Sequence, residues 1–185
     1  EPDLWDYPLG IEVPPGFQAG NTTDVTAFVS GTTYARYIGR ARRGLNQLDV
    51  LYQVTTAMTG GSPVGEIAVA CSGDPELLPS AGTNTIELQL IQYLDTSGRY
   101  NSLGRKKSSI VDIADTLQGT HLWVLLWSQA STPAQFRGGL PDTINVGSMF
   151  AAAATRPSTM SGWVVFTGTA NTFNDIWLGI KQLNA

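Results

Sequence analysis

The chain has 185 residues, of which 42% are hydrophobic and 14% charged, and this length suits one domain with its own core. The formal net charge is −4. A single cysteine (Cys71) excludes an intrachain disulfide framework and a cysteine-based zinc site, and a single histidine (His121) excludes a His-rich metal site. No apolar run reaches the roughly 18 residues of a membrane-spanning helix, and the acidic start at Glu1 leads us to expect no signal peptide.

The first part of the chain predicts an extended segment followed by strands. Proline and glycine recur over residues 1–20, which predicts an extended N-terminal arm, and residues 21–185 are expected to form the folded domain. Threonine, valine and aromatic residues over 22–38 indicate a strand. Residues 32–43 fit either a short helix or a strand.

Alternating or short apolar segments between turn residues predict the remaining strands. These segments are 47–58, 65–71, 108–114, 122–128, 143–151, 162–169 and 173–183. Residues 84–94 fit either a strand or a short helix, and residues 122–128 are apolar on both faces, which predicts a fully buried strand. We therefore expect an all-β fold, an eight-stranded antiparallel jelly-roll sandwich with one or two short helices in its loops.

Most of the cations fall in one part of the chain. Eight of the eleven lysines and arginines lie between residues 36 and 107. The predicted contact residues are Arg36, Arg40, Arg42 and Arg43, with Arg105, Lys106 and Lys107 as a weaker second patch. With Tyr34 and Tyr37 interleaved, the first cluster could neutralise phosphate and stack on bases, or it could form a salt-bridging face between subunits.

Few residues suggest metal binding or catalysis. Asp74 and Glu76 flank a proline in a turn and could bind calcium, although Asp is also an ordinary turn residue. His121 is the only candidate imidazole base, with Asp112 and Asp115 near it in sequence, but it begins a strand predicted to be buried. We expect His121 to be structural and the protein not to be an enzyme.

Several short motifs occur in order along the chain. They are Ala35-Arg36-Tyr37-Ile38-Gly39-Arg40-Ala41-Arg42-Arg43, Leu48-Asp49-Val50-Leu51-Tyr52, Gly65-Glu66-Ile67-Ala68-Val69-Ala70, Asp74-Pro75, Pro79 and Trp163-Val164-Val165-Phe166. Their order and spacing resemble the shell domain of single jelly-roll icosahedral virus coat proteins of the tombusvirus, sobemovirus and nodavirus kind. Picornavirus-like coat proteins are the second resemblance. The acidic first twelve residues depart from the basic arm that is usual in these families.

The resemblance implies a structural capsid protein that self-assembles into an icosahedral shell in the virion. Its expected partners are copies of itself and, on the inner face, the nucleic acid of the viral genome, without a membrane. Low charge agrees with this expectation, because obligate interfaces are more apolar than ordinary surfaces.

Two alternative functions stay open at this point. One is a carbohydrate-binding β-sandwich or virion projection domain, in which exposed aromatic rings stack on sugars. Its candidate residues are Trp5, Trp127, Trp163 and Trp177. The other is a glycosidase or esterase that uses Asp112, Asp115 or His121.

Overall fold

The computed structural model describes residues 17–26, 30–41, 47–60, 64–72, 83–95, 99–141, 148–151, 163–170, 175–176 and 178–183. Its strands are β1 (Phe17–Thr26), β2 (Thr32–Arg40), β3 (Gln47–Thr56), β4 (Val64–Ser72), β5 (Thr83–Asp95), β6 (Gly104–Lys107), β7 (Val111–Asp112), β8 (His121–Gln129), β9 (Gln135–Pro141), β10 (Ser148–Ala151), β11 (Trp163–Ala170), β12 (Asp175–Ile176) and β13 (Gly179–Leu183). Two short 3-10 helices, η2 (Arg99–Asn101) and η3 (Asp115–Leu117), lie in loops. No helix in these ranges is long and apolar enough to cross a membrane.

The first nine strands pair in a nested order. β4 pairs with β5, β3 with β6 and β7, β2 with β8, and β1 with β9, and every pair is antiparallel. Because β6 and β7 follow one another along β3, they fill one strand position. The result is two four-stranded sheets, β1-β9-β3-β6 and β2-β8-β4-β5, which we call the β3 sheet and the β8 sheet. The predicted eight-stranded antiparallel jelly-roll sandwich is confirmed.

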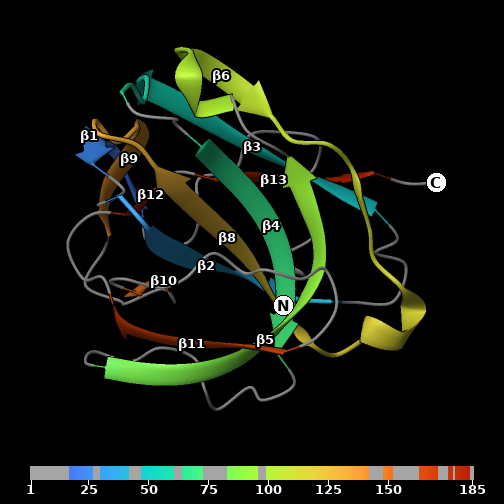
Figure 1. Ribbon diagram of the computed structural model, residues 1–185. Helices are drawn as coiled ribbons and strands as arrows, with labels where there is room; N and C mark the ends of the chain where they lie inside the picture. Colours follow the sequence, from blue (N-terminus) through green and yellow to red (C-terminus); the bar gives the residue numbers. More distant parts are fainter. Residues whose placement is uncertain are drawn as a thin grey trace.

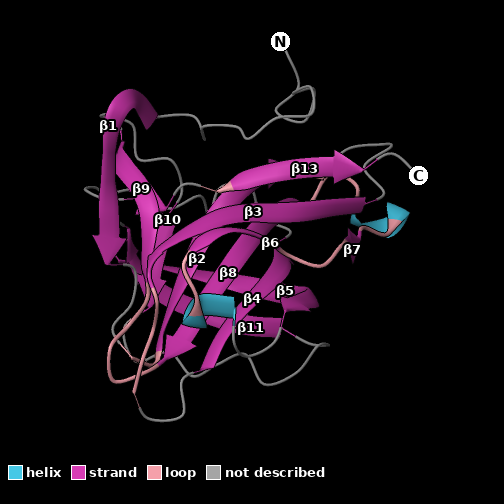
Figure 2. Cartoon of the chain, turned by 90° about the horizontal axis from the view of Figure 1, so that it is seen from above, coloured by secondary structure: helices cyan, strands magenta, loops and turns pink. Residues whose placement is uncertain are grey.

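The last strands extend both sheets. β10 pairs with β2, and β11 joins β10 to β5, so the β8 sheet closes into a ring of six strands. β12 pairs with β9, and β13 pairs with β3. Figure 1 shows β3 and β6 together at the top and β11 at the bottom, and Figure 2 shows β1 beside β9 and β13 beside β3.

Strand β3 is amphipathic, and its apolar residues face the β8 sheet. Leu48, Val50, Tyr52 and Val54 alternate along β3 and are at most 4% exposed. They share one core with Leu122, Val124 and Leu126 of β8. Two-residue periodicity therefore predicts which face of β3 the fold buries.

Strand β8 is buried on both faces, as its unbroken apolar sequence predicts. Every residue of the strand before Gln129 is buried. Trp123 and Leu125 point away from the first core and pack in a second one. That core lies inside the ring and consists of Ala35, Ala68, Ala70, Leu88, Leu90, Trp123 and Leu125.

The structure settles the ambiguous segments as strands. Residues 32–43 contain β2 rather than a helix, and residues 84–94 belong to β5. The strand predicted over 108–114 is confirmed only at β7, and residues 108–110 and 113–114 are not strand. Ser108 instead binds Val50 through both its backbone N–H and its side-chain oxygen, outside any regular ladder.

The predicted arm is described only at its end. Residues 1–16 lie outside the described residues, and residues 17–20 already belong to β1. β1 pairs with β9 at the edge of the β3 sheet.

Gly65 allows β4 to pass close to a buried aromatic ring. Tyr100 is 0% exposed, and its hydroxyl donates a hydrogen bond of 2.8 Å to the backbone oxygen of Glu66. Its ring packs edge-on against Phe136, with 5.0 Å between centroids. A Cβ atom at position 65 would overlap the Tyr100 ring. Glycine is therefore required by space at this position.

We expect Gly65→Ala to lower the free energy of unfolding by about 1–3 kcal/mol, the usual cost of overpacking a core. Urea denaturation of the variant and the wild type measures this loss. The same substitution in a Tyr100→Leu background should cost clearly less, because the ring that the methyl group meets is gone. An equal cost in both backgrounds would contradict the packing explanation.

Candidate functional site

The predicted arginine cluster does not form one described surface. Arg42 and Arg43 lie outside the described residues. The backbone of Arg40 pairs with His121, but its side chain also lies outside the description. Arg36 is described, and it is only 2% exposed.

Arg36 is therefore corrected from a contact residue to a core residue. Its register partner on β8 is Val124, whose side chain belongs to the core between the sheets. Tyr34, two residues earlier on β2, faces the same core. Alternation along the strand thus carries Arg36 into the interior, where it cannot reach a nucleic acid.

Burial shifts the pKa of two groups. It lowers the pKa of the Arg36 guanidinium to about 9, because the interior disfavours the charged form, and the side chain still carries its charge at neutral pH. It raises the pKa of the Cys71 thiol for the same reason. Cys71 is 2% exposed, so we infer an inert core thiol rather than a reactive one.

The candidate calcium and catalytic residues are not gathered into one site in the described part of the chain. Asp74 and Glu76 lie outside it, and no three His, Cys, Asp or Glu residues within it are arranged to hold a metal ion. His121 is 4% exposed, and its Nδ1 atom lies 3.0 Å from the hydroxyl of Tyr37. Asp112 accepts a hydrogen bond of 2.7 Å from Gln47 in the β3 sheet, whereas His121 begins β8.

The sugar-binding alternative loses one of its four aromatic residues. Trp127 is 9% exposed, because it lies on the buried strand β8. The side chains of Trp5, Trp163 and Trp177 lie outside the description. The described part of the chain therefore offers no exposed tryptophan for stacking on a sugar.

The second basic patch forms strand β6. Arg105 and Lys107 are exposed, and Lys106 is partly buried. In register, Arg105 lies opposite Gln53 and Lys107 lies opposite Leu51. Arg105 and Lys107 therefore share the outer face of the β3 sheet, away from its apolar core.

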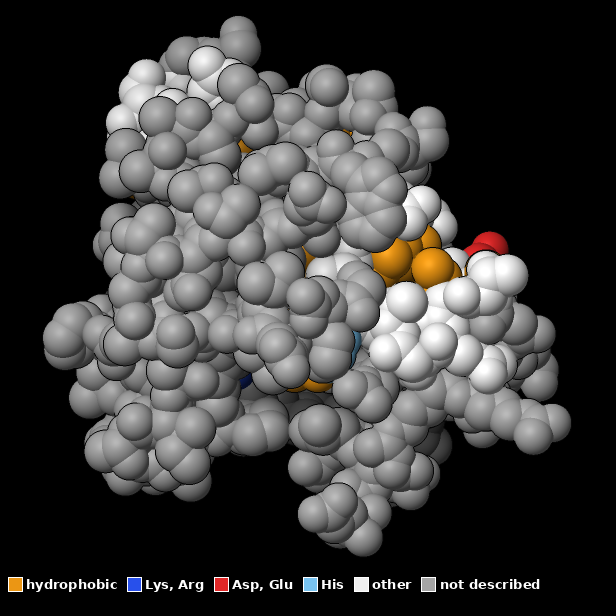
Figure 3. Space-filling view, turned by 90° about the horizontal axis from the view of Figure 1, so that it is seen from below, with side chains coloured by type: hydrophobic (Ala, Val, Ile, Leu, Met, Phe, Trp, Pro, Cys, Tyr) orange, Lys and Arg blue, Asp and Glu red, His pale blue; other side chains and the backbone are white. Residues whose placement is uncertain are grey.

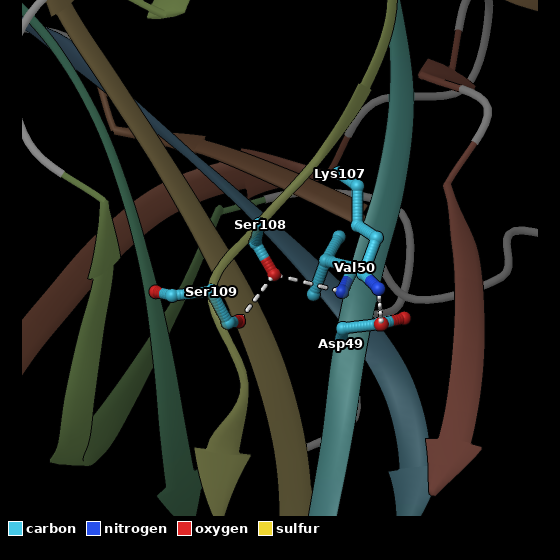
Figure 4. A network of polar contacts seen from close by, with 5 residues as sticks. All are labelled: Asp49, Val50, Lys107, Ser108 and Ser109. Atoms are coloured by element: carbon cyan, nitrogen blue, oxygen red, sulfur yellow. Dashed lines mark hydrogen bonds and ion pairs between the residues drawn. The ribbon is translucent and has the colours of Figure 1, made fainter.

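A polar network fastens the end of β6 to β3 (Figure 4). The ammonium of Lys107 lies 3.1 Å from a carboxylate oxygen of Asp49, whose side chain is 0% exposed. Neither carboxylate oxygen of Asp49 accepts a well-directed hydrogen bond, so the ion pair with Lys107 compensates the buried charge. Ser108 accepts a hydrogen bond of 2.9 Å from the backbone N–H of Val50 and donates one of 2.7 Å to the carbonyl of Ser109.

Apolar side chains flank this basic strand. Leu103 is 63% exposed and Ile110 is 44% exposed, and they are the large hydrophobic residues exposed in the described part of the chain. Figure 3 shows the molecule from below, the side opposite β6 in Figure 1, where the described hydrophobic side chains at the surface lie beside an acidic side chain. We call residues 103–110 the basic edge. Sequence reasoning found its cations and missed Leu103 and Ile110, although each lies within three residues of the basic triplet.

Sequence comparisons add no family assignment. No model of a protein family and no curated protein matches the chain. The all-β sandwich of two antiparallel sheets is therefore established by the structure alone, and a fold of this kind hosts many functions.

We expect Lys107→Met to lower the free energy of unfolding by about 1–3 kcal/mol, because it removes the cation that lies 3.1 Å from the buried carboxylate of Asp49. The double variant Lys107→Met/Asp49→Asn should recover most of the loss, since the uncompensated charge is gone. Arg105→Met is the matched control, because it removes an exposed cation from the same strand and should change stability by less than about 0.5 kcal/mol. Equal losses in the Lys107 and Arg105 variants, measured by urea denaturation, would contradict this role of the ion pair.

Proposed function

We propose that the chain is a structural capsid subunit that self-assembles into an icosahedral shell around a viral genome, and that it is not an enzyme. The observation that carries the proposal is the nested pairing of eight strands into two four-stranded sheets. Jelly rolls of this topology recur in viral capsid and lectin domains. The order of the coat-protein-like motifs along the chain favours the capsid over the lectin.

The composition supports extensive contact between copies. Only 14% of the residues are charged, below the roughly 25% of typical soluble domains. Permanent interfaces between subunits are depleted in charge and enriched in apolar area. A subunit that covers much of its surface with neighbours therefore needs few charged residues.

In this proposal, the arginines at the end of β2 and just after it contact the genome. Arg40, Arg42 and Arg43 are the candidates for phosphate neutralisation on the inner face, while the buried Arg36 is not. Arg105, Lys106 and Lys107 contact either the genome or a neighbouring subunit. Calcium binding by Asp74 and Glu76 stays a prediction.

Particle size tests the proposed assembly. Purified full chain should form closed particles of uniform diameter in negative-stain electron microscopy, and light scattering should show a mass far above that of one 19.8 kDa chain. Burial of apolar area between copies would favour the assembled state. A persistent 19.8 kDa monomer across concentration and ionic strength would contradict the proposal.

Charge removal tests the genome contact separately. Arg42→Gln/Arg43→Gln should form particles that hold less nucleic acid, with a weaker dependence of binding on salt, because fewer phosphates are neutralised. Arg156→Gln, which removes a cation outside the cluster, is the control. Particles of the double variant that package nucleic acid like the wild type would contradict this assignment.

A further inference from the structure

We propose that the basic edge binds the acidic N-terminal segment, residues 1–12, of a second copy of this chain. The inference rests on the proposed self-assembly and names one contact within it. Three observations support it: β6 pairs on one side only among the described residues, several contacts hold β6 firmly to β3, and residues 1–12 match the basic edge in charge and length.

In the part of the chain that the structure describes, strand β6 has a strand partner on one side only. Among the described residues it pairs with β3 alone, over four positions from Val54–Gly104 to Leu51–Lys107. In an antiparallel strand with one partner, about half of the backbone N–H and C=O groups point away from that partner. Leu103 and Ile110, at the two ends of the basic edge, are 63% and 44% exposed, so they too are available for contact.

The basic edge is held rigidly before any partner arrives. The ladder to β3 fixes its backbone, and the backbone N–H of Ser108 donates to the carbonyl of Val50 at 2.8 Å. The ion pair between Lys107 and Asp49 holds the outer face, as Figure 4 shows. On the other face, the ammonium of Lys106 donates a hydrogen bond of 2.6 Å to the hydroxyl of Ser102. A preorganised edge loses little conformational entropy on binding.

The N-terminal segment is complementary to the basic edge in charge. Its first twelve residues carry four acids and no base, whereas the basic edge carries three consecutive cations, of which Lys107 is already paired with Asp49. The four acids are Glu1, Asp3, Asp6 and Glu12. Opposite charges across such a contact steer the encounter and fix the register of the two strands.

The segment also matches the edge in length and apolar content. Pro2 and Pro8 cannot donate backbone hydrogen bonds, so pairing is confined to residues 3–7 between them. These five residues suit the four residues of β6. Trp5 or Tyr7 supplies an apolar ring for one end of the basic edge, Leu103 or Ile110, which phosphates of a nucleic acid would leave exposed. The contact is strand addition to an exposed sheet edge.

The sheet order favours a second copy as the source of the segment. The segment precedes β1, and β1 and β6 lie at opposite edges of the β3 sheet, with β9 and β3 between them. The chain therefore enters its own sheet at the edge farthest from its own β6. A neighbouring subunit can offer its basic edge without that constraint.

Isotope-mixed cross-linking tests the contact. Full-length unlabelled chain and chain labelled with heavy nitrogen are mixed before assembly and treated with a carbodiimide, which joins a carboxylate to a lysine in direct contact. Mass spectrometry should find peptides from residues 1–12 joined to Lys106 or Lys107 in pairs of mixed isotope. Links in same-isotope pairs only would place the segment on its own chain and overturn the inference, and so would assembled particles without these links.

Arg105→Glu tests the same contact by charge reversal. Arg105 is exposed and takes no part in the Lys107–Asp49 pair, so the variant keeps the contacts that fasten β6. We expect this variant to self-associate at least about tenfold more weakly than the wild type in sedimentation velocity. Adding Asp3→Arg/Asp6→Arg to the variant should restore the self-association. Arg156→Glu is the control for a charge reversal elsewhere.

The outcomes separate this inference from the proposed function. Normal shells with normal association of the Arg105→Glu chain overturn the docking and leave the capsid proposal standing. If the chain forms only small oligomers that still show mixed-isotope links, the docking is supported and the proposed shell is contradicted. An Arg105→Glu chain that loses nucleic acid but keeps wild-type association, in particles that show no mixed-isotope links to residues 1–12, assigns the basic edge to the genome and overturns the inference.

Discussion

The fold depends on one strand that has no face toward solvent. β8 pairs with β2 along one side and with β4 along the other, and all of its residues before Gln129 are buried. Leu122, Val124 and Leu126 belong to the core between the sheets, and Trp123 and Leu125 belong to the core inside the ring formed with β10 and β11. Two cores thus share one backbone, which leaves little room for a larger side chain at these five positions.

Strand β6, at the edge of the β3 sheet, is exposed to solvent whereas β8 is buried. β6 is paired on one side among the described residues, and its short length and basic side chains are features that normally protect such an edge against aggregation. Exposed Leu103 and Ile110 work against such protection, because they add apolar contact area at the same place. The combination suits a specific partner of negative charge and apolar content better than a surface that only repels neighbours.

Sequence periodicity is sufficient to predict the strands that have one or both faces buried in a core. β3 and β8 were predicted because their apolar residues alternate or run unbroken. Residues 84–94 were ambiguous by pattern, and pairing with β4 and β11 makes them a strand. The four residues of β6 carry no apolar signal, so the strand was missed although its cations were found.

The candidate site was less predictable than the fold. Charge alone placed Arg36 with the other arginines, and only the register of β2 against β8 shows that it faces the core. A buried arginine is uncommon, so composition argues against it at any single position. The ion pair between Asp49 and Lys107 joins residues 58 positions apart and depends on the pairing of β3 with β6.

A cryo-electron microscopy reconstruction of particles assembled from the full chain tests the central claim most directly. The account predicts a closed shell of jelly-roll subunits in which density from a neighbouring chain runs along the outer side of β6. Particles without symmetry, or a symmetric shell in which β6 faces solvent with no neighbouring chain beside it, would contradict it.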